Sequence, residues 1–181
     1  MPPHSEPILI DTKDFLLHPF GASDIKRFDS LSKDILQLFS QQQTTTYLPH
    51  KKLQHISHAE TLLQTGLLNQ YSGLSQLYFI TRKTDQKTIG MIELISPKNA
   101  ERHYQLDQYP YFLEFCISTE HSGKGIMGNI LPKLIRQLKC HGIHQLAAVA
   151  NPRNLSAIKV LQKSGITHQS HFDSINNLYH N

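Results

Sequence analysis

The stretch HSGKGIMG at residues 121–128 has the residue types and spacing that could hold a phosphate group. Gly123, Gly125 and Gly128 have the G-x-G-x-x-G spacing of a dinucleotide-binding loop, and Lys124 adds the Gly-Lys pair of a triphosphate-binding loop. Glycines allow a close approach of the backbone to a ligand because they lack a Cβ. A helical apolar pattern follows directly, so the free N–H groups of a helix start would face an anion. The sequence therefore predicts a phosphate site.

Two common phosphate sites do not fit this loop. A dinucleotide fold needs a strand that runs directly into the first glycine and an acidic residue about 20 positions later. Here STEHS separates the strand from Gly123, and the next strand pattern, LAAVA, contains no acid. A triphosphate loop needs glycine at position 118 and Ser or Thr at position 125, where this chain has Ser118 and Gly125. We therefore exclude both.

A second motif, ANPRNLSAIKVLQKSGI at 150–166, follows the glycine-rich stretch. It reads as a helix that Asn154 caps and Gly165 ends. Together with STEHSGKGIM it resembles the GNAT superfamily of acetyl-CoA-dependent N-acetyltransferases. Within that superfamily it resembles the Rim-type branch, which includes ribosomal-protein N-terminal acetyltransferases. The resemblance is specific over residues 114–166, and TYLP at 46–49 also resembles a segment between the first two helices of that branch.

The resemblance implies acetyl-CoA, or coenzyme A, as the bound co-substrate and assigns its contacts. The loop residues would place backbone amides around the pyrophosphate: Ser122, Gly123, Lys124, Gly125, Ile126, Met127 and Gly128. In this family the strand before the loop splays from its neighbour, so the free backbone groups of Phe115, Cys116 and Ile117 would pair with the pantetheine arm. Asn154 corresponds to an asparagine near the thioester end, and a plain helix cap is its simpler role.

Glu114 is the candidate catalytic base, because strand alternation places it beside the cofactor segment and on the same face as Cys116. The usual glutamate of the family corresponds to Phe112 here, so Glu114 departs from the pattern. A salt-bridged strand glutamate is the competing interpretation. Glu93, on the preceding strand, is a weaker candidate of the same kind.

Other catalytic roles stay open at this stage. Tyr109 or Tyr111 could donate the proton that the leaving thiolate needs. Cys116 suggests a covalent mechanism, but no His–Asp pair in the sequence supports it, and a buried apolar role is the simpler interpretation. Three H-x-x-H pairs occur without a third ligand, so we expect no metal site.

The elements that must position these residues follow from apolar periodicity. Strand patterns occupy 15–20, 77–83, 88–96, 109–118, 146–150, 167–172 and 177–180, and helix patterns occupy 24–39, 57–69, 126–141 and 154–164. An antiparallel first half followed by a βαβα second half predicts an α/β (α+β) fold with a mixed, mainly antiparallel sheet flanked by helices. The resemblance adds splayed central strands. We expect one N-acetyltransferase domain over residues 1–181, with 1–13 as a flexible lead-in.

Composition excludes several classes of function. The chain of 181 residues has a net charge of +4, but its basic residues are scattered, so we expect no nucleic-acid partner. No apolar run approaches the ~18 residues of a membrane span, and no signal-peptide pattern opens the sequence. Two cysteines fit a reducing compartment, so the expected location is cytoplasmic. Monomer and homodimer are both open.

Three functions fit these observations. The first is direct acetyl transfer from acetyl-CoA to a primary amine in a ternary complex, with a protein N-terminus as a candidate acceptor. The second is acetylation of a small-molecule amine such as a polyamine or an aminoglycoside-like drug, although Glu60 is the only acid in residues 41–76. The third is a GNAT module that binds coenzyme A without turnover, since the usual Ser, Tyr and Glu of the family are replaced.

Overall fold

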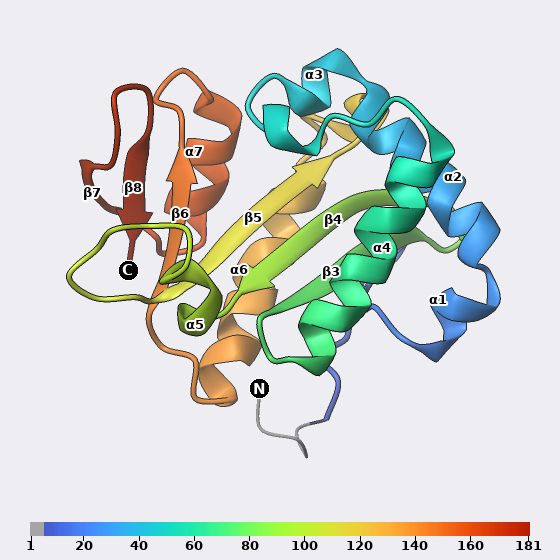
Figure 1. Cartoon of the computed structure of the whole chain (residues 1–181), viewed down its shortest axis with the longest axis horizontal. Helices are drawn as coiled ribbons and strands as arrows, with labels where there is room; N and C mark the ends of the chain where they lie inside the picture. The colour runs from blue at the N-terminus through green and yellow to red at the C-terminus, as the bar shows by residue number, and fades with distance from the viewer. Residues whose placement is uncertain (1–5) are drawn as a thin grey trace.

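The protein folds around an eight-stranded sheet with the strand order β1-β2-β3-β4-β5-β6-β8-β7 (Figure 1). The computed structural model describes residues 6–181. Its strands are β1 (Ile10–Asp11), β2 (Phe15–Pro19), β3 (Ser75–Arg82), β4 (Thr88–Ile95), β5 (Tyr111–Ile117), β6 (Leu146–Ala150), β7 (His168–His171) and β8 (Asn177–His180). Its helices are α1 (Ala22–Lys26), α2 (Phe28–Ser40), α3 (Gln42–Thr45), α4 (Ile56–Tyr71), α5 (Pro97–Ala100), α6 (Ile126–Cys140) and α7 (Leu155–Lys163), with 3-10 turns η1 (Pro49–Lys51) and η2 (Thr119–His121).

The sheet is antiparallel except at its centre, where β5 and β6 run parallel. These two strands pair over only two positions, Tyr111↔Leu146 and Phe112↔Ala147. Beyond them β5 continues along β4, and β6 continues along β8. The strands therefore diverge toward their C-terminal ends, which confirms the predicted mixed sheet with splayed central strands.

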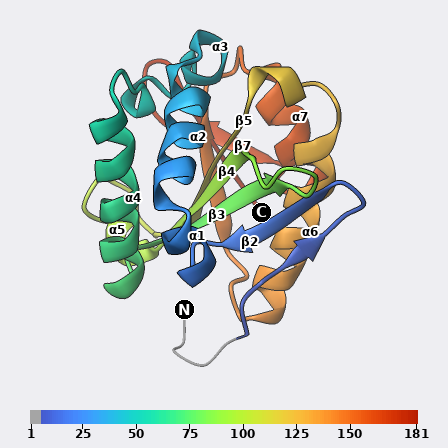
Figure 2. The ribbon, with the colours of Figure 1, turned by 90° about the vertical axis from the view of Figure 1, so that its right-hand side faces the viewer.

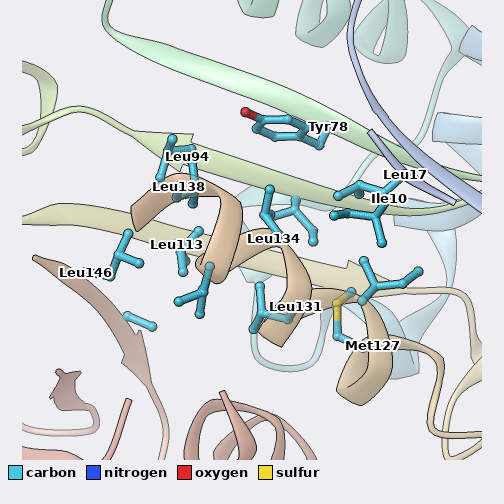
Figure 3. Close-up of a cluster of buried hydrophobic side chains, with 14 of the residues drawn as sticks. Ile10, Leu17, Tyr78, Leu94, Leu113, Met127, Leu131, Leu134, Leu138 and Leu146 are labelled. Carbon is cyan, nitrogen blue, oxygen red and sulfur yellow. The ribbon is translucent and has the colours of Figure 1, made fainter. Parts of the chain in front are cut away.

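Helices cover both faces of the sheet, and a large core cluster lies on each face. Figure 2 shows α2 and α4 on one side and α6 and α7 on the other. The wide apolar stripe of α6 packs on the sheet through side chains that are almost completely buried, among them Met127, Leu131, Leu134 and Leu138 (Figure 3). Within residues 6–181, no helix has the length and apolar character needed to cross a bilayer.

The predicted helix at 24–39 is interrupted near its start. The structure has α1 and α2 with a break at Arg27, whose backbone (φ −114°, ψ 27°) leaves helical geometry. The Arg27 guanidinium donates to the Thr88 hydroxyl at 2.9 Å and to the Gln86 carbonyl at 2.6 Å, so side-chain contacts with β4 accompany the break. The expected loop at 41–52 also contains two short helical turns, α3 and η1.

The expected flexible lead-in is wrong for the residues just before β2. Ile8 and Ile10 are 3% and 5% exposed and belong to the core cluster under α6. Ile10–Asp11 forms β1 on the edge of the sheet, and Asp11 pairs with Lys83. The alternation of Ile8 and Ile10 places both on the buried face, which the neighbouring prolines and charges obscured. The remainder of the lead-in at 1–5 lies outside the described residues.

Replacing Ile10 by alanine should lower the free energy of unfolding by about 2 kcal/mol, because it leaves a cavity under α6. Leu9 is the matched control: it is 55% exposed, so Leu9→Ala should cost less than about 0.5 kcal/mol. Urea unfolding followed by circular dichroism measures both. Equal effects of the two substitutions would mean that β1 does not contribute to the core.

Candidate active site

The loop before α6 has the backbone geometry of an anion site. Gly123 and Gly125 both have φ +74°, in the left-handed region that side chains rarely adopt. Nothing lies within 4 Å of where a Cβ on either glycine would be, so the space in front of the loop is open. In the described chain, the amides of Ile126, Met127 and Gly128 have no backbone acceptor, as expected for the first turn of a helix. These donors and the helix dipole favour a negative group.

The other loop residues contribute differently. The amide of Ser122 donates to the Thr119 carbonyl at 3.2 Å, so this amide is not free to bind a ligand. Lys124 is exposed. Gly128 lies inside α6, and a Cβ there would meet the Lys163 Cδ at 3.6 Å, an ordinary contact. Gly128 is thus the one loop glycine whose backbone conformation does not require glycine.

The segment Phe115–Ile117 lies where β5 has separated from β6. Its side chains alternate: Phe115 and Ile117 pack toward α6, and Cys116 packs into the core beneath α2 and α4. Burial raises the pKa of the Cys116 thiol to about 12, so it stays protonated at neutral pH. A thiol in this state is a poor nucleophile, which argues against a covalent acetyl-cysteine mechanism.

Asn154 caps α7, where its side-chain oxygen accepts a hydrogen bond from the Ala157 amide at 3.2 Å. The helix that it caps packs against α6, and its last residue, Lys163, reaches the first turn of α6. The helices that begin at the two sequence motifs, 118–127 and 150–166, are thus in contact with each other.

Glu114 belongs to a four-residue cluster of charged and titratable side chains. Its Oε2 lies 2.8 Å from His50 Nε2, and its Oε1 lies 2.8 Å from Lys51 Nζ. Lys51 also donates to Glu93 Oε2 at 2.5 Å. Glu93 and Glu114 are direct cross-strand partners on β4 and β5, so Lys51 bridges two carboxylates that would otherwise repel.

The cluster fixes the charge of its members. Burial by itself would raise the pKa of Glu114, but the hydrogen bond from His50 and the charge of Lys51 outweigh it and lower the pKa to about 2. Burial would lower the pKa of Lys51, and the two carboxylates outweigh it and raise that pKa well above its usual value. Glu114 and Lys51 are therefore both ionised at neutral pH.

The segment that carries His50 and Lys51 spans the opening of the sheet. The Tyr47 hydroxyl donates to the Arg153 carbonyl at 3.2 Å, which joins this segment to the connection before Asn154. Gln41 Oε1 accepts from the Thr119 amide at 3.1 Å, which joins it to the loop before α6. Figure 1 shows α3 at the end of the sheet toward which β5 points. The cluster, the splayed strands and the amide loop thus form one continuous region.

Comparisons with known proteins agree with this geometry. A sequence profile of the acetyltransferase (GNAT) domain matches residues 16–167. This chain belongs to the GNAT acetyltransferase family. The protein is therefore an N-acetyltransferase with acetyl-CoA as its co-substrate, as the motifs at 118–127 and 151–166 implied.

Solved structures show the same fold. The ribosomal L7/L12 α-N-protein acetyltransferase RimL, in complex with coenzyme A, matches with a TM-score of 0.71 and 15% identity over 96% of this chain and 97% of that chain. The ribosomal-protein-S5-alanine acetyltransferase from Vibrio fischeri matches with a TM-score of 0.66 and 15% identity over 96% of each chain. The microcin C7 self-immunity acetyltransferase MccE, in complex with acetyl-CoA and AMP, has a TM-score of 0.70 and 16% identity over 94% and 93%. No curated protein sequence matches this GNAT chain significantly.

Sequence reasoning missed His50 and Lys51 in this GNAT acetyltransferase. They lie 64 and 42 positions from the carboxylates that they contact, Glu114 and Glu93, so no local spacing links them. Tyr109 is not free to act as an acid, because its hydroxyl donates to the Tyr104 carbonyl and accepts from the Leu106 amide. In the described part of the chain, no three His, Cys, Asp or Glu side chains are grouped to hold a metal ion.

Proposed function

We propose that this GNAT acetyltransferase transfers an acetyl group to the α-amine of a protein or peptide N-terminus by direct attack within a ternary complex. The observation that supports it most is the continuous region between the amide loop and the Glu114 cluster. Along this region the amide loop comes first, then the open edge of β5, and then the Glu114 cluster. These three parts would hold the pyrophosphate of acetyl-CoA, its pantetheine arm and the acceptor amine, in that order.

The residues present fit coenzyme A. The free amides of Ile126, Met127 and Gly128, at a loop opened by Gly123 and Gly125, would hold the pyrophosphate. The remaining loop residues, Ser122 and Lys124, would contribute a hydroxyl and a charge. The backbone groups of Phe115 and Ile117 on the open edge of β5 would pair with the amides of the pantetheine arm, whereas those of Cys116 face β4, and Asn154 would lie near the thioester end. Bound acetyl-CoA supplies the activated acetyl group.

The chain must then supply three things for the transfer: a neutral amine, donors for the developing oxyanion and a proton for the thiolate. An α-amine has an ordinary pKa of about 8, against about 10.4 for lysine, so an N-terminal acceptor loses its proton more readily. The backbone N–H groups of Phe115 and Ile117, which face the open edge of β5, would stabilise the oxyanion. Glu114 would act at the amine end, because it lies two residues beyond the last β5–β6 pair.

The charge of the cluster favours an N-terminal acceptor over a polycation. Lys51 engages both Glu93 and Glu114, so little unbalanced negative charge is left to bind a second or third ammonium group. RimL is a ribosomal L7/L12 α-N-protein acetyltransferase, and the Vibrio fischeri protein is a ribosomal-protein-S5-alanine acetyltransferase, so a protein acceptor has precedent on this fold. A polyamine would instead need carboxylates that no internal lysine neutralises.

A thiol-release assay tests the proposal, with peptides that begin with serine, alanine or methionine compared with spermidine and an aminoglycoside. We expect acetylation of at least one peptide, with kcat/KM at least about tenfold above that for spermidine. Mass spectrometry should place the acetyl group on the α-amine. Peptides that bear a blocked N-terminus and a free lysine are the control. Transfer to spermidine alone would support a small-molecule acceptor instead.

A further inference from the structure

We propose that His50 accepts the proton of the attacking amine, with Glu114 orienting its ring and Lys51 holding Glu114 in place. The inference rests on the proposed function and names the group that carries out its proton transfer. It assigns Glu114 a positioning role in place of the role of direct base.

The hydrogen bond between His50 and Glu114 determines which ring nitrogen is basic. An ionised carboxylate can only accept hydrogen bonds, so at 2.8 Å the His50 Nε2 must donate. The lone pair of a neutral His50 ring is then on Nδ1. Among the described residues nothing hydrogen-bonds to Nδ1, and the His50 side chain is 60% exposed. The basic nitrogen thus has no hydrogen-bond partner among the described residues and belongs to a mostly exposed side chain, which an acceptor could approach.

Lys51 prevents Glu114 from taking that proton itself. The two carboxylate oxygens of Glu114 are both engaged, Oε1 by Lys51 and Oε2 by His50. Glu93, Lys51 and Glu114 are 14%, 13% and 22% exposed, so this ion cluster is mostly shielded from water. A carboxylate in this position accepts a proton poorly but orients an imidazole well.

The position of His50 suits the reaction. Glu114 marks the point where β5 and β6 separate, and the Tyr47–Arg153 hydrogen bond holds the segment of His50 across that opening. An amine that enters from the face of α2 and α4 would pass the imidazole before it reaches the strand edge. The titratable and charged neighbours are Glu114 from β5, Glu93 from β4 and the adjacent Lys51. Tyr104, whose pKa is raised by burial and then by the two carboxylates, completes this set.

The proton balance closes within this arrangement. The amine lone pair forms the C–N bond to the acetyl carbonyl carbon, and the N–H proton moves to Nδ1 of His50. The C–S bond breaks, and the thiolate leaves with the bonding electron pair. The imidazolium returns its proton to that thiolate, which gives coenzyme A and neutral His50.

The decisive experiment compares His50→Gln with His55→Gln, a matched control for an exposed histidine on the same segment. Acetyl-CoA and the best peptide acceptor are used over pH 6–9. We expect kcat/KM of His50→Gln to fall at least about tenfold at pH 7, with partial recovery when free imidazole is added. His55→Gln should match the wild type. Coenzyme A affinity from calorimetry should be the same in all three. An unchanged rate and pH profile in His50→Gln would overturn the proposal.

A second measurement does not depend on the acceptor. Nitrogen-15 NMR of the imidazole should show the Nε2–H tautomer of His50, because Nε2 donates to Glu114, and Glu114→Ala should remove this preference between the two tautomers. An Nδ1–H tautomer in the wild type, or a tautomer preference that Glu114→Ala leaves unchanged, would contradict the proposal. If the wild type acetylates no amine at all, the proposed function fails separately. The slow hydrolysis of acetyl-CoA, with water as the nucleophile, then tests His50 as the base. A hydrolysis rate that His50→Gln leaves unchanged would exclude this role.

Discussion

Replacing Gly125 by glutamate is expected to weaken coenzyme A binding by about 100-fold, or roughly 3 kcal/mol. Gly125 has φ +74°, so any side chain there strains the backbone by about 1–2 kcal/mol. The new carboxylate would also occupy the open space in front of the amides of α6 and repel the pyrophosphate. Isothermal titration with coenzyme A measures the loss directly.

Gly142→Glu is the matched control for this variant. Gly142 has φ +84° and equally open surroundings, but it lies at the opposite end of α6. Both variants should lose similar stability in thermal unfolding, since both place a side chain in the left-handed region. Only Gly125→Glu should lose affinity for coenzyme A. Equal affinities in the two variants would show that the loop does not hold the cofactor.

Replacing Lys51 by methionine is expected to lower the free energy of unfolding by about 3 kcal/mol at pH 7, because it leaves two shielded carboxylates without their counter-charge. Glu93 and Glu114 would then face each other across β4 and β5 as like charges. Urea unfolding of the wild type and the variant measures the difference. Combining Lys51→Met with Glu93→Gln and Glu114→Gln should recover most of the loss, since the unpaired charges are removed.

The same variant should show a characteristic pH dependence. In the wild type the pKa of Glu114 is lowered from 4.5 to about 2, so its ionisation stabilises the fold above pH 4.5. That contribution is lost as the pH falls from 4.5 toward 2. Lys51→Met removes the part of this contribution that comes from Lys51, and only the hydrogen bond from His50 then opposes the effect of burial on the pKa of Glu114. The stability difference between wild type and variant should therefore be largest near pH 7 and shrink below pH 4.5. A difference that is independent of pH would contradict the ion cluster.

Much of the local structure of the proposed cofactor site could be predicted from short stretches of sequence. Gly123 and Gly125 adopt the left-handed backbone, Asn154 caps α7, and Glu114 lies on β5 with its side chain on the same face as Cys116. Each of these features depends on backbone preferences within a few residues, so spacing alone reveals it. The strand and helix patterns likewise gave the order of the elements and the mixed sheet.

Other features needed contacts between distant segments. The break at Arg27 accompanies hydrogen bonds to residues 59 and 61 positions away. The burial of Ile10 comes from packing under α6. Local periodicity could not show either, because both depend on which elements become neighbours in the folded chain.

The sequence by itself determined the family and the backbone geometry of the loop proposed to bind coenzyme A, because each of the two GNAT motifs is a continuous stretch whose geometry is set by local backbone chemistry. Only the tertiary structure decided how Glu114 is used. The register of β4 and β5 places Glu93 opposite Glu114, and the segment after α3 brings His50 and Lys51 onto them. The resulting balance between burial and ion pairing fixes the charge of Glu114. That balance depends on distances between residues that are far apart in the sequence, and the spacing of residues along the chain does not reveal those distances.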